Sequence, residues 1–379
     1  MIDSVEQAFV VPEVKKKSFA ELRNFILENN MVDLKTLQRF AGKCISFLLA
    51  IPSAKLYTRE INLAIGKMSK NSKPVKVSGE LRDEIQHWEF LDEWKGCFPW
   101  RTERHFQLSI ATDASLYRWG AVIDSKDALA DYFEASDARH IHDKECDTLF
   151  NTLCSIEHKI ANCRVDAYVD NLVVVNAWEN QKSRTPSLIK WSKDLFCFVH
   201  RNNIDLRLFY VPSSDNPADI ESRRLSLQDS MLSPKSWQAV QKAFGPHSLD
   251  LMSLDSNVML DERGLPLRHF TPYPTPKSAG VNVFAQELSG QKGLYAFPPF
   301  CMISALIQFL EEQKPVSCTI VIPEKKPVPL WWPRIMSAAK DRITLGVKGE
   351  NSVILSPSVS GFARRELPCC LIPVRLEFV

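Results

Sequence analysis

Four acidic residues lie far apart along this chain of 379 residues: Asp113, Glu145, Asp170 and Asp219. Asp113 is expected near the middle of a strand and Asp170 at the end of another, and Glu145 and Asp219 are expected near the starts of helices. Carboxylates that meet at one point repel one another and raise one another's pKa values. Two divalent cations about 3.5 to 4 Å apart relieve that repulsion, and such a pair activates water and stabilises the leaving oxygen of a phosphodiester. Mg²⁺ suits a shell made of oxygen ligands. If the four side chains converge, the sequence predicts metal-assisted hydrolysis of a nucleic-acid backbone.

Each acid also has an ordinary structural interpretation. Asp113 could cap a turn, and Glu145 could interact with the dipole of a helix in its first turn. Asp170 could cap a following helix, and Asp219 could be a solvated acid at the start of another. A shared site is favoured because the order of the elements can bring all four residues to one end of a sheet.

The hydrophobic pattern between residues 105 and 232 predicts three strands, a helix, a strand, two helices, a strand and a helix. If the first and fourth strands are neighbours, Asp113 and Asp170 lie side by side, and Glu145 and Asp219 can face them from their helices. The predicted elements cover 106–113, 118–124, 127–134, 142–160, 164–170, 171–180, 185–203, 206–212 and 216–224.

Four segments resemble the ribonuclease H domain of retroelement polyproteins, particularly of DIRS-like and gypsy-like retrotransposons: TDASLYRWGAVI, HIHDKE, VDN and YVPSSDNPADIESR. The resemblance implies a mixed five-stranded sheet with helices and cleavage of the RNA strand of an RNA·DNA hybrid. It implies two Mg²⁺ ions held by the four catalytic acids, and substrate-binding positions at Asn171, Asn216, Arg223 and His142. It also implies that Asn216 and Arg223 support the final loop and helix. Many relatives have glycine where this chain has Arg118, and we expect this arginine on the surface side.

Basic residues near the predicted site give a second expectation about the substrate. They lie near the four acids in the sequence and could hold the phosphates of the substrate. The ordinary alternative is a solvated basic surface. The residues are Arg139, His140, His142, Lys144 and Arg223.

Residues 1–104 have a helical pattern, with apolar residues three or four apart from Leu34 to Leu48 and again from Leu81 to Leu91. Ser78 is the expected N-cap of the second group, PSAK at 52–55 separates two helices, and 67–76 is a polar connector. The segment LKTLQRFAGKCISFLLAIPSAKLYTREI resembles the thumb and connection helices that follow a reverse transcriptase palm. The palm is absent, so we expect no DNA synthesis.

Residues 233–379 alternate strand and helix patterns with proline-rich loops, which predicts an α/β unit. Segments such as SLDLMSLDSN, YAFPPF and LWWP resemble a phage-type adenine-N6 DNA methyltransferase with a Rossmann-like sheet. In that family the catalytic tetrapeptide begins with Asp or Asn, which accepts a hydrogen bond from the target amino group. Here the tetrapeptide is Phe297, Pro298, Pro299 and Phe300, so methyl transfer and binding of S-adenosylmethionine are not expected.

The composition describes a globular protein of several domains, with 45% hydrophobic residues, 24% charged residues and a net charge of +2. The ten cysteines include no CxxC pair, no apolar run is long enough to span a bilayer, and we expect a cytoplasmic or nuclear location without membrane contact. Expected partners are an RNA·DNA hybrid or other nucleic acid, and the polymerase and recombinase parts of a retroelement polyprotein. The alternative function is a catalytically silent nucleic-acid-binding module from a decayed or domesticated retrotransposon.

Overall fold

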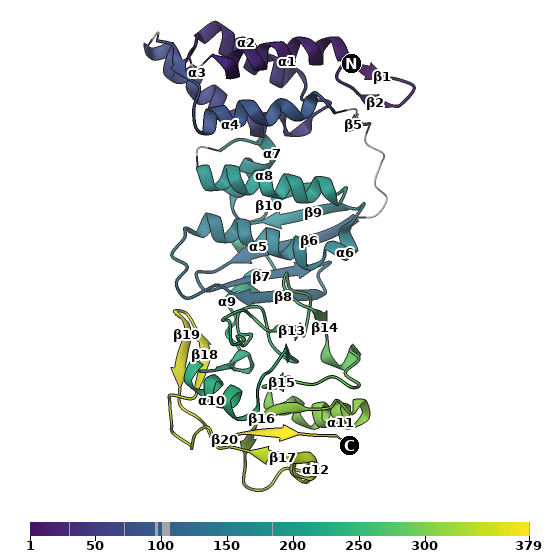
Figure 1. Ribbon diagram of the computed structural model, residues 1–379, viewed down its shortest axis with the longest axis vertical. Coiled ribbons are helices and arrows are strands. Elements are labelled where there is room, and N and C mark those ends of the chain that lie inside the picture. Colours follow the sequence, from purple (N-terminus) through teal and green to yellow (C-terminus); the bar gives the residue numbers. More distant parts are fainter. Residues whose placement is uncertain (30, 72, 95–97, 101–106, 184, 379) are drawn as a thin grey trace. The chain divides into compact units, whose positions relative to one another are not determined.

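A computed structural model describes residues 1–29, 31–71, 73–94, 98–100, 107–183 and 185–378 (Figure 1). The chain forms two compact units. The first contains Met1–Gln107, Asn162–Val165 and Leu172–Leu208, and the second contains Leu108–Ala161, Asp166–Asn171 and Phe209–Val379. The predicted domain boundaries at 104 and 232 stay predictions. No helix in the described ranges is long and apolar enough to cross a membrane.

The N-terminal part of the first unit is a helical bundle, as predicted. Its four α-helices surround a core in which the rings of Phe19 and Phe40 stack 4.8 Å apart. PSAK at 52–55 separates two helices, as predicted, and residues 52–58 form a 3-10 helix there. Two other expectations are wrong, because Gly79, not Ser78, is the N-cap, and the third helix continues to Asn71 before a short strand. The helices are α1 (Glu13–Glu28), α2 (Leu34–Ser46), α3 (Arg59–Asn71) and α4 (Glu80–His87).

A five-stranded sheet has the strand order β10-β9-β6-β7-β8. Strand β7 pairs antiparallel with β6 and β8. β9 and β10 run parallel, since Asp205 donates its N–H to Cys163 O (2.9 Å) and Val211 donates to Val169 O (3.1 Å). The predicted mixed five-stranded sheet is therefore confirmed, although Phe106 lies outside the described residues. The strands are β6 (Gln107–Ala114), β7 (Arg118–Ile123), β8 (Asp127–Tyr132), β9 (Arg164–Val169) and β10 (Asp205–Tyr210).

The helices that follow these strands also match the predicted order. The predicted helix over 142–160 breaks at Ile156 into two pieces, and its apolar residues Leu149, Leu153 and Ile160 are buried. Burial of one helical face fixes the rotation of the longer piece about its axis, and this also fixes the direction of the side chains in its first turns. The helices are α5 (Ile141–Ser155), α6 (Glu157–Ile160), α7 (Leu172–Asn180), α8 (Pro186–Arg201) and α9 (Asp219–Arg223).

A second, seven-stranded sheet has the order β14-β13-β12-β15-β16-β20-β17. Strands from β14 to β16 pair parallel, and β20 pairs antiparallel with both β16 and β17. The predicted alternation of strands and helices is confirmed, for example where α11 is followed by β16, whereas the Rossmann-like methyltransferase class stays a prediction. The elements are β12 (Leu249–Asp250), β13 (Arg268–Thr271), β14 (Gly280–Val281), β15 (Leu294–Ala296), α11 (Ile303–Gln313), β16 (Cys318–Glu324), α12 (Trp332–Ala338), β17 (Ala339–Arg342) and β20 (Cys370–Leu376).

The C-terminal segment also covers the edge strand β8 of the first sheet. Tyr273 Oη donates to Ala130 O (2.8 Å), and Ser256 donates its N–H to Asp131 Oδ2 (3.2 Å) and its hydroxyl to Asp131 Oδ1. Asp131 is only 3% exposed, so these bonds replace water around a buried carboxylate. Loops of the C-terminal segment are therefore joined to β8 by polar contacts.

Candidate metal centre

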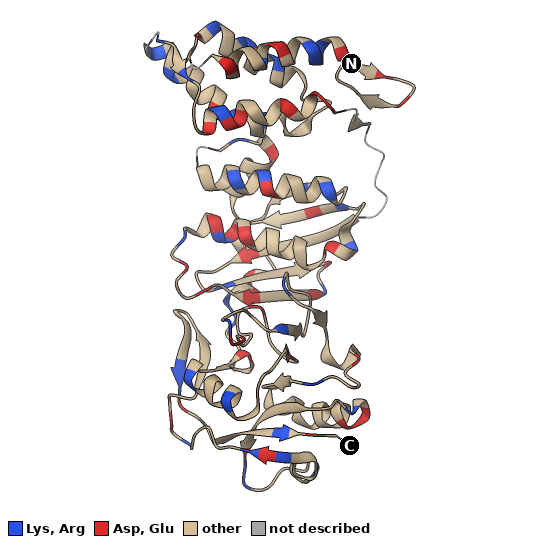
Figure 2. Cartoon of the chain, in the orientation of Figure 1, with Lys and Arg blue, Asp and Glu red and all other residues tan. Residues whose placement is uncertain are grey.

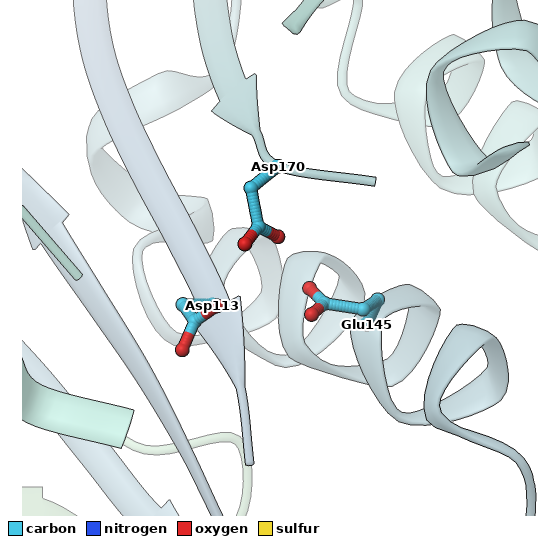
Figure 3. Close-up of side chains that lie close together, drawn as sticks. All are labelled: Asp113, Glu145 and Asp170. Atoms are coloured by element: carbon cyan, nitrogen blue, oxygen red, sulfur yellow. The ribbon is translucent and has the colours of Figure 1, made fainter. Parts of the chain in front are cut away.

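Three of the four predicted acids meet in one place, and Figure 3 shows their carboxylates directed toward one another. Asp113 lies near the end of β6, Asp170 directly follows β9, and Glu145 lies in the second turn of α5. One carboxylate oxygen from each lies within 4.8 Å of the others. Asp113 and Glu145 are buried, and Asp170 is half-buried. The neighbouring ends of two strands and one helix thus build a compact acidic cluster.

The fourth acid, Asp219, lies outside this set of three. It is the first residue of α9, and Arg223 one turn later donates to its Oδ1 from Nε (2.8 Å) and lies 2.7 Å from it through Nη2. Its charge nevertheless helps to raise the pKa of Asp113. The arrangement places Asp219 at the border of the cluster, paired with a cation, and its predicted role as a metal ligand stays a prediction.

Two serines that the sequence analysis did not single out hold the aspartates. Ser222 Oγ, on α9, donates to Asp113 Oδ2, and Ser213 Oγ donates to Asp170 Oδ2 (2.5 Å). Each serine binds one oxygen of its carboxylate, and no hydrogen bond from a described residue reaches the other oxygen. Both serines lie in the segment YVPSSDNPADIESR. Their hydroxyl groups stand close in sequence to an expected metal ligand, and this was the signal that could have identified them.

Gly120 allows α9 to approach the cluster. It pairs with Asp113 across the ladder between β6 and β7. A Cβ atom at this position would lie 2.5 Å from the N atom of Ser222 and 2.8 Å from the carbonyl carbon of Glu221, closer than real contacts allow. The glycine in RWGAVI is therefore required by the close passage of a helix over the sheet.

Burial makes the cluster electrostatically unfavourable without a cation. Burial, and then the charges of Asp113 and Asp170, raises the pKa of Glu145 to about 9. Burial also raises the pKa of Asp113, against the hydrogen bond from Ser222. Oε2 of Glu145 is buried and has no hydrogen-bond partner in the described part of the chain. Three oxygen ligands, one of them buried and unpaired, fit a hard divalent cation such as Mg²⁺.

Asn171 and His142 form a polar pair beside the cluster. Asn171 follows Asp170, and its Nδ2 lies 2.8 Å from Nδ1 of His142, which is three residues before Glu145 on α5. Partial burial and the nearby His140 lower the pKa of His142. A neutral ring that accepts from Asn171 at Nδ1 carries its proton on Nε2. These two predicted substrate-binding residues therefore flank the acids.

The structure corrects the expected position of Asn216. Its side chain is only 4% exposed, its Nδ2 donates to Thr112 O (2.9 Å), and its Oδ1 accepts from the N–H of Ala218 (3.1 Å). Both ends of the amide are used inside the protein, so Asn216 supports the loop before α9 and is not placed to contact a substrate.

Two basic residues are also buried, contrary to expectation. Arg118 is 4% exposed, and its Nη1 donates to Tyr132 Oη (2.7 Å) and Arg224 O (2.6 Å). Lys144 is 1% exposed, and its Nζ donates to Leu116 O (2.5 Å). Arg118 is therefore not on the surface side, and Lys144 can neither hold a phosphate nor belong to a solvated basic face.

The tetrapeptide Phe297–Phe300 follows β15 and lines a separate pocket of about 320 Å³. Proline, aromatic and aliphatic side chains form most of the wall, and Lys325 Nζ lies 5.4 Å from the centre of the Phe300 ring. None of the described residues that line this pocket is acidic. The wall thus offers no carboxylate in place of the one that Phe297 lacks.

Comparisons with known proteins gave matches only among solved structures. No family model and no curated protein matches the chain. LC11-RNase H1 from compost, in complex with an RNA/DNA hybrid, is 17% identical, with 30% of this chain and 91% of that chain covered and a TM-score of 0.26. RNase H1 from Halobacterium salinarum is 16% identical over 30% and 92% of the chains, with a TM-score of 0.26.

A foamy viral protease-reverse transcriptase in complex with an RNA/DNA hybrid is 11% identical, with a TM-score of 0.23. That match covers 59% of this chain and 31% of the viral chain. Similarity at these levels assigns neither a family nor a function, so the geometry of the metal centre has to carry any functional assignment. The resemblances to DIRS-like and gypsy-like elements and to adenine methyltransferases stay predictions.

Proposed function

We propose that this protein is a metal-dependent ribonuclease H that hydrolyses the RNA strand of RNA·DNA hybrids. The observation that supports it most directly is the meeting of Asp113, Glu145 and Asp170 within 4.8 Å, with a buried, unpaired oxygen on Glu145. Such a cluster is unfavourable unless a cation offsets its charge, and a helix and two strands are arranged to build it.

The three acids would hold Mg²⁺, and Asp219 would join them after exchanging its partner Arg223 for an ion. Bound divalent ions supply an activated water and stabilise the leaving oxygen of the phosphodiester. Ser222 and Ser213 each hold one oxygen of an aspartate, which restrains the rotation of each carboxylate. Positioned ligands of this kind need little reorganisation when the reaction occurs.

Asn171 and His142 would contact the ribose next to the scissile phosphate. Their polar atoms lie beside two of the acids, and an RNA strand differs from a DNA strand in its 2′-hydroxyl groups. Arg223, whose side chain is 64% exposed, would contact a phosphate when Asp219 releases it. Asn171, His142 and Arg223 are thus the proposed substrate-binding residues.

The test is cleavage of a labelled RNA·DNA hybrid with and without Mg²⁺, using the wild-type chain and the variants Asp113→Asn and Glu145→Gln. We expect magnesium-dependent cutting of the RNA strand, and a loss on the order of 100-fold or more in each variant. The matched control is Asp127→Asn, an exposed acid on β8, which should cut normally. Hybrid binding without any cleavage would reject the nuclease and support a silent binding module.

We also infer that residues 233–379 do not transfer methyl groups. Phe297 cannot accept a hydrogen bond from an amino group, and the described wall of its pocket has no acid to replace it. Incubation with labelled S-adenosylmethionine and DNA should leave the DNA unlabelled. Labelled adenine would overturn this inference.

A further inference from the structure

We propose that the hairpin formed by β18 (Ile354–Ser358) and β19 (Gly361–Arg365) is a second contact for the nucleic acid. It would bind the phosphate backbone of the duplex a short distance from the metal centre. The inference rests on the proposed function, because it assumes that the duplex occupies the acidic cluster. It adds a binding surface contributed by the C-terminal segment.

The tip of the hairpin lies beside the turn that carries the metal centre. Val359, Ser360 and Gly361 share a pocket of about 290 Å³ with Leu116 and Lys144, among other residues. Leu116 is three residues after Asp113, and Lys144 directly precedes Glu145. Lys144 Nζ also donates to Leu116 O (2.5 Å), which joins the two segments that carry Asp113 and Glu145 beside this pocket. Glu134 and Asp137 line the pocket as well.

The hairpin is held firmly in this position. A Cβ atom on Gly361 would lie 2.3 Å from Cβ of Ala135, so the two backbones are in close contact, and its φ of +95° suits glycine. The ring of Phe362 lies 5.5 Å from that of Tyr132. At the other end, Ile354 pairs with Leu232 of β11 (Met231–Leu232). A binding surface fixed in advance loses little entropy when a ligand binds.

The outer strand of the hairpin is basic and open. β19 is an edge of the three-stranded sheet β11-β18-β19, and Figure 2 shows basic colouring on this strand. Arg364 and Arg365 are exposed, and neither forms an ion pair with any residue in the described ranges. Residues 354–365 contain no acid. Successive side chains of a strand point to opposite faces, so Arg364 and Arg365 place one guanidinium on each side of this edge, with Arg365 beside the pocket of Phe297. Such a pair complements a duplex whose phosphates lie on both sides of the strand.

The spacing also fits a duplex. Arg364 is three residues beyond Gly361, which corresponds to about 10 Å along an extended strand. Each strand of a duplex carries a phosphate about every 3.4 Å of helix axis. The arginines would therefore contact phosphates about three base pairs from those beside the hairpin tip. The alternative role for charges on an edge strand is protection against aggregation, which requires no nucleic acid.

The test compares binding of short and long hybrids in the Asp113→Asn background, which prevents cleavage. Fluorescence anisotropy with hybrids of 8 and 24 base pairs would be measured over a range of salt concentrations. Reversal of both charges, Arg364→Glu with Arg365→Glu, should weaken binding of the long hybrid about tenfold or more and reduce the salt slope by about 2. Binding of the short hybrid should be unchanged.

The matched control reverses two exposed lysines elsewhere in the second unit, Lys292→Glu with Lys340→Glu, and so makes the same change in net charge. An unchanged salt slope in the arginine variant, an equal loss in the lysine control, or no binding of the long hybrid by the starting protein would each overturn the proposal. Cleavage of the short hybrid by the wild-type chain tests the proposed function separately, because that substrate does not reach the arginines.

Discussion

Arg118 is a buried cation next to the turn of the hairpin between β6 and β7, and its removal should lower the stability of the fold. Its guanidinium donates to Tyr132 Oη and Arg224 O and lies 3.7 Å from Asp229. Arg118→Leu would leave these groups without their donor, so we expect the free energy of unfolding to fall by about 2–4 kcal/mol. Urea denaturation would measure it.

The control for this prediction is Arg224→Leu. The Arg224 side chain is 66% exposed, and its ion pair with Glu221 is long, with 3.9 Å between Nη1 and Oε1. The backbone carbonyl of residue 224 would still accept the hydrogen bond from Arg118 in this variant. We expect a change within about 0.5 kcal/mol. Equal effects of the two substitutions would show that burial of Arg118 contributes nothing to stability.

His269 gives a prediction about pH. Burial lowers its pKa, but the hydrogen bonds to Asp255 (2.7 Å) and to the carbonyl of Leu267 (3.2 Å) outweigh that effect, and the pKa is raised overall. A histidine with a raised pKa stabilises the fold fully below its unfolded pKa of about 6.5, and this contribution is lost as pH rises through the folded pKa.

Urea denaturation of the wild-type chain and of His269→Gln from pH 6 to pH 9 would check this. The stability difference between them should shrink as pH rises above about 6.5. His158→Gln, which changes an exposed histidine, should leave the pH profile as it is. A difference that stays constant across this range would reject the linkage.

At the scale of elements, the passage of α9 over β7 depends on a position without a side chain. Gly120→Ala would push Cβ against the backbone of Glu221 and Ser222. The shift of α9 should cost roughly 1–3 kcal/mol of stability and reduce hybrid cleavage, because Ser222 would no longer hold Asp113. Thermal unfolding and the cleavage assay would measure the two effects.

Gly42→Ala is the matched control for Gly120. Gly42 lies in α2, and a Cβ atom there would have no neighbour within 4 Å. This substitution should raise stability by about 0.5–1 kcal/mol, since alanine favours a helix. A Gly120→Ala chain with normal stability and normal cleavage would contradict the proposed role of the close approach.

The hydrophobic pattern predicted the elements of the five-stranded sheet. The meeting of Asp113, Glu145 and Asp170 was expected from the order of these elements, if the first and fourth strands are neighbours, and from the family resemblance. Alternation and helical spacing are local properties, and they determine which face of each element is buried. Contacts between residues distant in sequence could not be predicted this way. Arg118 bonds to a carbonyl 106 residues later, and Asp219 has a cation within its own helix that competes with a metal ion.

At the scale of the molecule, the C-terminal segment should be needed for the stability of the five-stranded sheet. A chain that ends at Leu232 would expose the edge of β8 and remove the partners of Ala130 and Asp131. We expect a lower melting temperature and a smaller soluble fraction, because open edge strands pair with other chains. Scanning calorimetry and centrifugation of freshly made protein would measure both.

Ser256→Ala in the full-length chain tests the same contact with a smaller change. It removes the hydroxyl that donates to Asp131 and leaves the rest of the segment in place. We expect a stability loss of about 1 kcal/mol, well below that of the shortened chain. A shortened chain as stable and soluble as the complete one would refute the dependence.

The bonds between Ser256, Tyr273 and β8 have a consequence for how the C-terminal segment can change over generations. Selection can preserve this segment as a cover even in a lineage where its own pocket has no substrate, because newly made copies without it would associate through the bare strand. Substitutions among the residues that line the pocket at Phe297 are then tolerated, whereas loss of the loops that carry Ser256 and Tyr273 is not. The fold of the C-terminal segment can thus be retained while the residues of its pocket change.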